Sequence, residues 1–354
     1  MRRSFSIPLG IMAAGTAAVA YAAGVEVNLY RLRRFSIPLL DPGEQPLRIL
    51  QVSDIHMVPG QRRKQAWLRS LAELQPDLVV NTGDNLSHPD AVPEVIDTLE
   101  PLTALPGVFV LGSNDYYQAS RLNPAKYLRH GDRSHAPRRK RAENDWPALQ
   151  AAFTKAGWLD LTNARSTLDL PGRGLSLDFV GVDDPHVRRD RYPAKAGPDG
   201  DAHEEQPVPH SGDRRSVGQD SATHEGQDEG AGRQGIGHSA GRTRTTSGGA
   251  GRDLTIGVTH APYLRVLDAM TTEGVPLILA GHTHGGQLCV PFYGALVTNC
   301  DLDRARAKGL HTHAVGGNTA HLHVSAGCGA SRYAPVRFAC PPEASLITLL
   351  PRAG

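Results

Sequence analysis

The 354-residue chain has few aromatic side chains and no strong excess of charge of either sign. Phe, Trp and Tyr make up 5% of its residues, and its formal net charge is +2 at pH 7. So small a charge gives no indication of binding to a polyanion, and nucleic acid is not expected as a partner. Glycine and proline are abundant, at 38 and 26 residues, so part of the chain is not expected to form packed core.

Cysteine is scarce and is confined to the last quarter of the sequence, at Cys289, Cys300, Cys328 and Cys340. No two cysteines have the Cys-x-x-Cys spacing, so a zinc ribbon is disfavoured. Two interpretations remain open. The cysteines are buried free thiols, or, if the domain is exported, they form Cys289–Cys300 or Cys328–Cys340 disulfides.

Large apolar residues are missing from one long segment. Between Ala194 and Arg252 there is no Leu, Met, Phe, Tyr or Trp, while Gly, Ser, Asp, Glu, Arg and His are frequent. Such a composition buries too little apolar surface to offset chain entropy. The segment is therefore predicted to be a disordered insertion, at about 194–252, and its four histidines to belong to a solvated linker rather than a metal site.

The N-terminus has the layout of an export signal or a single membrane anchor. Arg2 and Arg3 precede an uncharged, Ala- and Gly-rich stretch from Ile7 to Gly24. The alternative is a buried N-terminal helix. We expect residues 1–24 to direct the chain to a membrane or across it, with the exported or cell-surface side favoured. Residues 25–354 would then form the folded domain.

Apolar strand-like runs alternate with amphipathic helical patterns in the rest of the chain. Strands are expected over Leu78–Asn81 and Val108–Leu111, and helices over Arg63–Leu74, over Val92–Leu102 and from Asp145 to about Ala156. Each strand ends in a polar turn, and most of these turns contain glycine. This alternation predicts an α/β fold.

Several of these strands end in carboxylate, amide or imidazole side chains. In chain order these residues are Asp54, His56, Asp84, Ser113, Asn114, Asp115, His260, His282 and His284. In open α/β sheets, ligands bind at the carboxyl ends of the strands. The stretch "LILAGHTHGGQ" places His282 and His284 in a glycine-flanked turn, where an extended chain would point both rings the same way.

The mixture of nitrogen and oxygen donors suits Mn, Fe or Zn better than Ca²⁺, which prefers oxygen ligands alone. The donors are too numerous for one ion. Two ions bridged by one carboxylate fit the two-metal scheme of hydrolysis. The sequence therefore predicts two divalent metal ions.

The pattern of "SDIH", "TGDN", "GSND", "VTH" and "AGHTHGGQ" resembles that of the calcineurin-like metallophosphoesterase superfamily, and the resemblance runs from about Leu47 to Leu350 with the insertion excluded. These motifs, together with the apolar N-terminal segment that precedes them, are most similar to those of the membrane-associated branch of bacterial phosphodiesterases. The resemblance implies a four-layer α-β-β-α sandwich of two mixed sheets.

The resemblance also implies a role for each matching residue. Asp54, His56 and His284 would hold the first ion, and His260 and His282 the second. Asp84 would bridge both ions. The implied activity is phosphoester hydrolysis, in which two metal ions act as Lewis acids towards the attacking water and the phosphate.

One motif departs from the family pattern. Where the family has Gly-Asn-His-Asp, this chain has Gly112-Ser113-Asn114-Asp115. Either a one-residue shift lets Asn114 bind the second ion, which we favour, or that ion loses a protein ligand. In both cases the histidine thought to assist the leaving group is missing.

The implied substrate is a phosphorylated small molecule, with a lipid-linked or nucleotide-diphosphate compound such as a UDP-diacylglucosamine-like molecule as one form. The competing hypothesis is a degenerate metallophosphoesterase that serves as a membrane-tethered binding scaffold.

Asp183, Asp184 and His186 either line the pocket or form a turn that closes a strand. A His-x-His pattern recurs at His311–His313 and His321–His323, and the pair in "HLHVSAG" is predicted to be one face of a strand rather than a further metal site.

Overall fold

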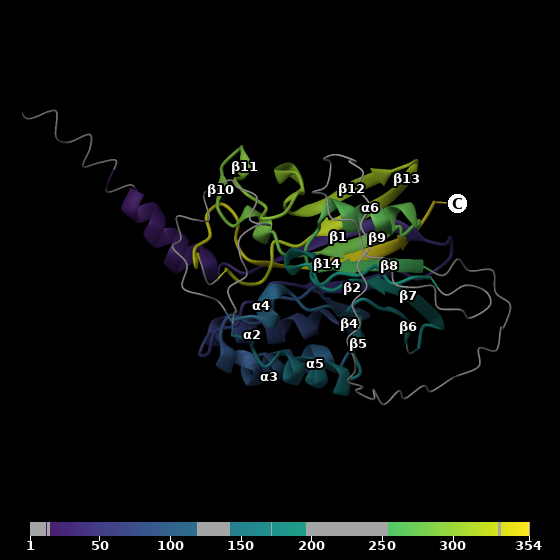
Figure 1. The fold of residues 1–354 in the computed structure, drawn as a ribbon, viewed down its shortest axis with the longest axis horizontal. Helices are drawn as coiled ribbons and strands as arrows, with labels where there is room; N and C mark the ends of the chain where they lie inside the picture. The colour runs from purple at the N-terminus through teal and green to yellow at the C-terminus, as the bar shows by residue number, and fades with distance from the viewer. Residues whose placement is uncertain are drawn as a thin grey trace, which may run out of the picture. The chain divides into compact units, whose positions relative to one another are not determined.

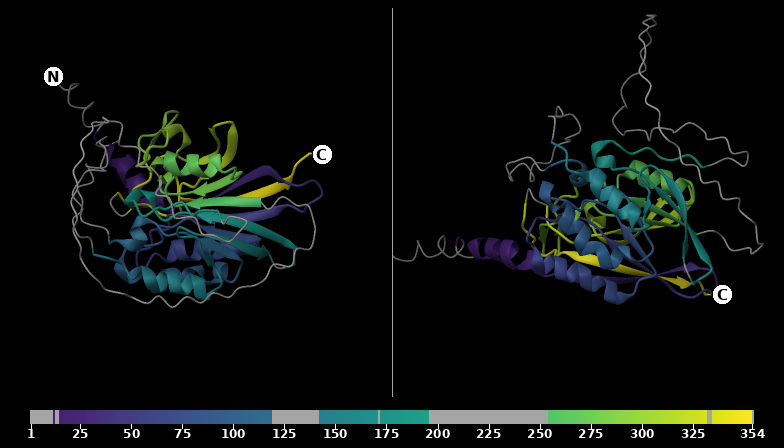
Figure 2. Two further views of the ribbon diagram at one scale, coloured as in Figure 1. Left: turned by 45° about the vertical axis from the view of Figure 1, so that its right-hand side comes forward. Right: turned by 90° about the horizontal axis from the view of Figure 1, so that it is seen from below.

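The computed structural model describes residue 12 and residues 15–118, 142–170, 172–195, 254–331 and 334–353. Two six-stranded sheets are stacked face to face in this part of the chain, with helices on the outside of each (Figures 1 and 2). The predicted α/β fold, a four-layer sandwich of two mixed sheets, is confirmed. The predicted insertion lies, apart from its first two residues, outside the described residues.

The first sheet has the strand order β1-β14-β2-β3-β4-β5, in which β14 and β2 are antiparallel and the other neighbours are parallel. Helices α2, α3 and α5 pack against its outer face (Figure 1). The bounds are β1 Arg31–Leu40, β2 Leu47–Val52, β3 Leu78–Asn81, β4 Gly107–Phe109, β5 Leu159–Asp160, β14 Glu343–Pro351, α2 Arg62–Ser70, α3 Val92–Thr103 and α5 Trp146–Lys155.

The second sheet has the order β12-β13-β9-β8-β7-β6, and helix α6 packs on its outer face. The pairs β12–β13 and β6–β7 are antiparallel, and the others are parallel. The bounds are β6 Arg165–Leu170, β7 Leu175–Gly181, β8 Leu254–Thr259, β9 Leu277–Ala280, β12 Gly309–Val315, β13 Asn318–Val324 and α6 Leu264–Thr272. His321 and His323 therefore lie on a strand, as predicted, and His311 and His313 lie on the neighbouring strand β12.

The layering explains why the central strands are apolar without alternation. In β9, Leu277 and Leu279 belong to the core between the two sheets, whereas Ile278 and Ala280 pack into the outer core beneath α6. Both faces of the strand are covered, so every side chain in it is buried. Strands buried on both faces read as continuous apolar runs.

Shorter elements connect the layers. They are α4 Ser113–Tyr116, a hairpin of β10 Cys289–Val290 and β11 Gly294–Ala295, and the turns η1 Tyr21–Val25, η2 Glu26–Asn28, η3 Leu71–Leu74, η4 Pro89–Ala91, η7 Pro185–Val187, η8 His284–Gly286 and η9 Arg304–Arg306. The helix predicted over Arg63–Leu74 consists of α2 followed by η3. Asp145 caps α5 as predicted, because its Oδ1 accepts a hydrogen bond from the Ala148 amide at 3.2 Å.

The structure corrects the predicted membrane-associated or exported location. Among the described residues, no helix combines the length and apolarity needed to cross a bilayer. The described helical residues at the N-terminus run from residue 15 to Val25. The helix then meets Glu26, which is buried and accepts a hydrogen bond from the Cys340 amide at 2.6 Å. Residues 1–11, 13 and 14 of the predicted segment lie outside the described part.

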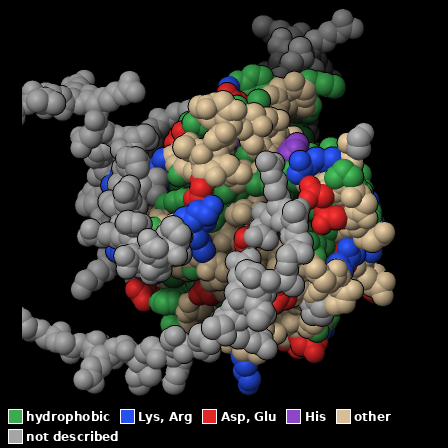
Figure 3. Space-filling model, turned by 90° about the vertical axis from the view of Figure 1, so that its right-hand side faces the viewer, with side chains coloured by type: hydrophobic (Ala, Val, Ile, Leu, Met, Phe, Trp, Pro, Cys, Tyr) green, Lys and Arg blue, Asp and Glu red, His purple; other side chains and the backbone are tan. Residues whose placement is uncertain are grey.

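The surface seen in Figure 3 carries acidic and basic side chains side by side. Neither sign of charge forms a continuous patch where the described atoms are visible on this face. The interspersed charges agree with the small net charge of the sequence, +2 at pH 7.

Candidate metal centre

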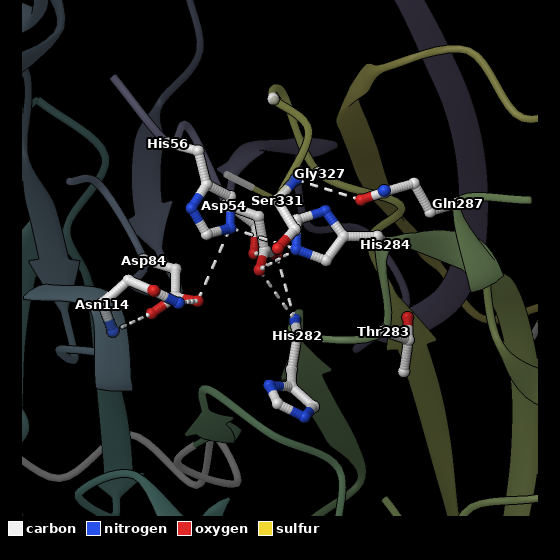
Figure 4. Close-up of polar contacts among 12 residues, drawn as sticks. Asp54, His56, Asp84, Asn114, His282, Thr283, His284, Gln287, Gly327 and Ser331 are labelled. Carbon is white, nitrogen blue, oxygen red and sulfur yellow. Dashed lines mark hydrogen bonds and ion pairs between the residues drawn. The ribbon is translucent and has the colours of Figure 1, made fainter. Parts of the chain in front are cut away.

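The loops after five strands of both sheets bring the seven predicted site residues together. Asp54 and His56 follow β2, Asp84 follows β3, Asn114 follows β4, His260 follows β8, and His282 and His284 follow β9. Asn114 is partly exposed and the other six are buried. Figure 4 shows six of the seven converging from the two sheets. The candidate centre thus lies where the carboxyl ends of these strands meet.

Asp54, His56 and His284 form one tight group. One ligand atom from each residue lies within 4.8 Å of the others. Nε2 of His56 is 3.0 Å from Nε2 of His284, which in turn is 3.6 Å from Oδ1 of Asp54. Two imidazole nitrogens and a carboxylate that converge in a buried position are a donor set suited to a divalent cation. These are the residues predicted for the first ion.

A second group of three consists of Asp54, Asp84 and His260. Oδ2 of Asp84 lies 3.4 Å from Nε2 of His260 and 3.6 Å from Nε2 of His56. The Asp84 carboxylate therefore lies between the two groups, where a bridging ligand is required. His282 adjoins the second group, since its Nδ1 is 3.3 Å from Nε2 of His260. Unlike the predicted scheme, Asp54 belongs to both groups.

The remaining ring nitrogens have partners that fix the imidazole rings. Nδ1 of His260 donates to the Thr82 carbonyl oxygen at 2.8 Å, which leaves Nε2 free to bind a cation. Nδ1 of His56 is 2.9 Å from the Ser87 hydroxyl. Nε2 of His282 donates to the Asn299 carbonyl oxygen at 3.4 Å, so Nδ1 is its ligand atom. Such outer contacts orient metal-binding histidines and select the tautomer.

Burial controls the protonation of these residues. It lowers the pKa of His56 to about 4 and lowers the pKa values of His282 and His284 well below the usual range. These three rings are therefore neutral at pH 7, the form that binds metal ions. Burial alone would lower the pKa of His260, but the Asp84 and Asp184 carboxylates raise it well above its usual value.

In the metal-free protein the His260 imidazole carries a proton, and a cation that binds there must displace it. Because neighbouring carboxylates raise the His260 pKa well above its usual value, we expect binding of the second ion to release a proton from His260. Affinity for this ion should fall roughly tenfold for each pH unit below 7. Titration calorimetry in buffers of different ionisation enthalpy measures this proton. His260→Gln should abolish its release and His321→Gln should not; equal release from both variants would contradict the assignment.

The backbone at the centre adopts an uncommon conformation. Five of the predicted ligands have positive φ, between 47° and 71°, namely Asp54, His56, Asp84, His282 and His284. Non-glycine residues rarely adopt such angles, and they cluster at functional sites. The expectation that an extended chain aligns His282 with His284 is wrong. The stretch turns sharply into η8, and the two rings face different groups because of that turn.

Glycine is required where the two sheets' loops touch. A Cβ atom on Gly281 would overlap the Ser53 hydroxyl oxygen and lie 2.6 Å from Oδ2 of Asp54. The Ser53 hydroxyl also donates to that carboxylate oxygen at 2.5 Å. The glycine before the His-x-His pair therefore lets β9 approach Asp54.

Gly281→Ala is expected to displace Asp54 and to weaken binding of the first ion at least tenfold, with a parallel loss of activity. Metal titration of the purified variant measures the affinity. Gly24→Ala is the matched control, since a Cβ there meets nothing within 4 Å. An unchanged affinity in Gly281→Ala would show that the Asp54 loop can move aside at no cost.

Asn114 contacts the proposed bridging carboxylate from α4. Its amide N–H donates to Oδ1 of Asp84 at 2.8 Å, and its Nδ2 donates to Oδ2 at 2.7 Å (Figure 4). The side chain thus lies at the edge of the candidate centre. Sequence reasoning named Asp115 without giving it a role. Its carboxylate accepts hydrogen bonds from the backbone amides of Asp84, Asn85, Leu86 and Gly112, which joins the β3 and β4 loops.

The "GVDDPH" segment fits both interpretations made from its sequence, because part of it forms a turn and part of it lies beside the candidate centre. Asp183 closes a turn, since it accepts hydrogen bonds from the Tyr116 hydroxyl and from Nε of Arg189, each at 2.8 Å. Asp184 is buried, and burial raises its pKa to about 7. His186 reaches the centre, because its ring centroid lies 4.5 Å from that of His282.

Two buried cations behind the first group escaped the sequence analysis. Nζ of Lys64 donates to the carbonyl oxygens of Ile55 and His56, at 2.8 and 3.3 Å. Arg337 is fully buried, and its guanidinium donates to several carbonyl oxygens, including that of His284 at 3.3 Å. Lys64 lies in a predicted helix and Arg337 lies beyond the last motif, so no sequence signal marked them. Both hold the loops that carry His56 and His284.

Comparison with known proteins agrees with this geometry. The profile of the calcineurin-like phosphoesterase family matches residues 47–286. The chain belongs to that family. It is accordingly a phosphoesterase-type hydrolase, and its clustered Asp and His residues indicate binding of divalent metal ions.

Two further similarities are more limited. The chain is 39% identical over 79 residues to a Bacillus subtilis (strain 168) protein named "Uncharacterized metallophosphoesterase YkuE", a match that spans 22% of this chain and 26% of the relative. The crystal structure of the Thermus thermophilus protein TT1561 aligns with 80% of this phosphoesterase and 91% of that chain, at 11% identity and a TM-score of 0.36.

Proposed function

We propose that this phosphoesterase is a dinuclear metal-dependent hydrolase of phosphodiester or diphosphate bonds. The observation that carries the proposal is the position of the Asp84 carboxylate, whose Oδ2 lies 3.4 Å from Nε2 of His260 and 3.6 Å from Nε2 of His56. One carboxylate oxygen between two buried imidazole groups is suited to bridging two cations.

In this proposal Asp54, His56 and His284 bind one ion, His260 and His282 bind the other, and Asp84 binds both. The bound ions supply Lewis-acid activation of water and stabilise the charge that develops on the phosphate oxygens. Asn114 holds the Asp84 carboxylate through its amide N–H and Nδ2. We infer that its Oδ1 binds the second ion after rotation of the amide.

The choice of substrate class rests on the missing histidine. An amide such as that of Asn114 has no proton to give to a leaving oxygen at neutral pH. Bonds whose leaving group is already a stabilised anion need less protonation, so diphosphates and activated phosphodiesters are favoured. The loop of the β10–β11 hairpin exposes Phe292 and Tyr293. It follows the His284 turn and offers an aromatic surface for the nucleobase or acyl part of a nucleotide-diphosphate or lipid-linked substrate.

The proposal is tested by metal reconstitution followed by a hydrolysis panel. Elemental analysis after loading with excess Mn²⁺, Fe²⁺ or Zn²⁺ should give two ions per chain. The panel compares phosphomonoesters, phosphodiesters, nucleoside diphosphate esters and lipid-linked diphosphates, and one of the last three classes should be cleaved fastest. At most one ion per chain would refute the dinuclear centre.

The same panel separates the enzyme from the scaffold hypothesis. A binding scaffold does not require six buried candidate ligand side chains that converge on one place. In this chain all six converge. Two bound ions together with no hydrolysis of any class would favour the scaffold. Two ions with turnover would exclude it.

A further inference from the structure

The four cysteines are free thiols, which is one of the two interpretations left open by the sequence, and neither of the alternative disulfides is formed. Instead, the structure places Cys289 of β10 near Cys340, since Sγ of each lies against the carbonyl oxygen of Gly285, at 3.2 and 3.5 Å. The two thiols are separated by 51 residues in sequence but share one buried cluster with Ala295, Ala307 and Ala326. Only thiols that lie this close can be joined without a large backbone movement.

Both thiols contact the turn that carries the predicted ligand His284. Sγ of Cys289 donates to the Gly285 carbonyl oxygen at 3.2 Å. Sγ of Cys340 lies 3.4 Å from the His284 carbonyl oxygen and 3.5 Å from that of Gly285. A Cβ on Gly285 would lie 2.7 Å from Sγ of Cys340, so turn and thiol are closely packed. A chemical change at these sulfur atoms therefore acts directly on His284.

The surroundings of Cys340 favour its reactive form. Its Sγ accepts a hydrogen bond from Nζ of Lys308 at 3.4 Å and lies 3.9 Å from NH1 of Arg337. Positive groups near a thiol favour the thiolate, which is the nucleophile towards oxidants.

We propose that Cys289 and Cys340 form a reversible disulfide under peroxide and that this modification loosens the ion bound by His284. The sulfur of Cys340 attacks a peroxide oxygen, the O–O bond breaks, and a sulfenic acid and water result. The sulfur of Cys289 then attacks the sulfenic sulfur, the S–O bond breaks, and a second water leaves. Two thiols are thereby oxidised and one peroxide is reduced to two water molecules.

The effect on the metal follows from the loss of both S–H groups. A disulfide can no longer donate to the carbonyl oxygens of His284 and Gly285, and its sulfur atoms must approach to about 2.0 Å. The His284–Gly286 turn is packed closely against the sulfur atoms, so it must shift. This second half of the proposal rests on the proposed function, whereas disulfide formation does not.

The experiment uses the full chain, reduced or treated with hydrogen peroxide and then alkylated. The denatured wild type should show four thiols when reduced and two after oxidation, with four restored by dithiothreitol. Mass spectrometry should link the peptides that contain residues 289 and 340. In Cys300→Ser, a matched control, the count should fall from three to one, whereas Cys340→Ser and Cys289→Ser should form no intramolecular link.

Metal titration then tests the consequence separately. Oxidised wild type should bind one of its two ions at least tenfold more weakly, while peroxide should leave the affinities of Cys289→Ser unchanged. Four thiols remaining in the wild type, or a link between other cysteines, would overturn the modification. Unaltered affinities in a protein shown to carry the disulfide would overturn only its action on the centre. Failure of the reduced protein to bind two ions would instead count against the proposed function.

Discussion

Asp84→Asn is expected to lower hydrolysis at least a thousandfold and to leave no more than one metal ion per chain. The carboxylate lies between the two groups, 3.6 Å from Nε2 of His56 and 3.4 Å from Nε2 of His260. An amide keeps the size of the side chain but removes the negative charge that would hold two cations close together. A thousandfold loss corresponds to about 4 kcal/mol of transition-state stabilisation.

The measurement pairs elemental analysis with steady-state kinetics on the best substrate of the panel. Asp97→Asn is the matched control, because Asp97 forms a surface ion pair with Arg69 and its side chain is 76% exposed. Exposed pairs contribute at most about 1 kcal/mol, so metal content and turnover should stay unchanged there. Full metal occupancy in Asp84→Asn would mean that Asp54, which both groups share, is the bridging ligand.

The ends of the apolar strands located the candidate site residues in the sequence, whereas the four layers were implied by the resemblance to the metallophosphoesterase superfamily. A strand covered on both faces is apolar throughout, and the polar residue that follows it marks the carboxyl edge of the sheet. This argument located Asp54, Asp84 and His260. It required no knowledge of how distant strands pair, because all these edges face the same side of the fold.

Other features depend on contacts that no local pattern encodes. The positive φ angles of His282 and His284 follow from the packing of η8 and not from the His-x-His spacing. Cys289 and Cys340 lie near each other because the segment before β14 runs beside the β10–β11 hairpin. There the Cys289 backbone amide donates to the Phe338 carbonyl oxygen at 2.9 Å. Sequence proximity pointed instead to Cys289–Cys300, which the fold does not join.

The membrane prediction failed for a different reason. It depended on the local layout of basic and apolar residues, which does not show what the end of the apolar stretch contacts. Buried Glu26 ends the helical part, and the Arg337 amide donates to the Ala22 carbonyl oxygen at 3.0 Å. These contacts could not be read from hydropathy.

Asn114→His is expected to lower second-metal occupancy and the hydrolysis of activated aryl diesters together, at least tenfold, because the variant loses the amide that we propose binds the second ion. The wild type should show a steep dependence of rate on leaving-group pKa, because no imidazole occupies this position. A general acid contributes on the order of a hundredfold or more, mainly for poor leaving groups. If Asn114 instead takes the place of the family histidine, the variant should speed alkyl diesters and flatten the dependence, and a series of diesters with graded leaving groups measures the slope.

Two further variants decide which residue of the motif supports the second ion. Because Asn114 contacts both oxygens of the Asp84 carboxylate, Asn114→Ala should weaken second-metal occupancy and turnover together, whereas Ser113→Ala should have a mild effect. The reverse order would assign Ser113 to the metal-binding position of the ungapped motif. If the wild-type slope is already flat, another group supplies the proton, and His186 is the first to test, since its ring lies 4.5 Å from that of His282. His186→Gln should then steepen the slope without reducing the two bound ions, which distinguishes a proton donor from a ligand.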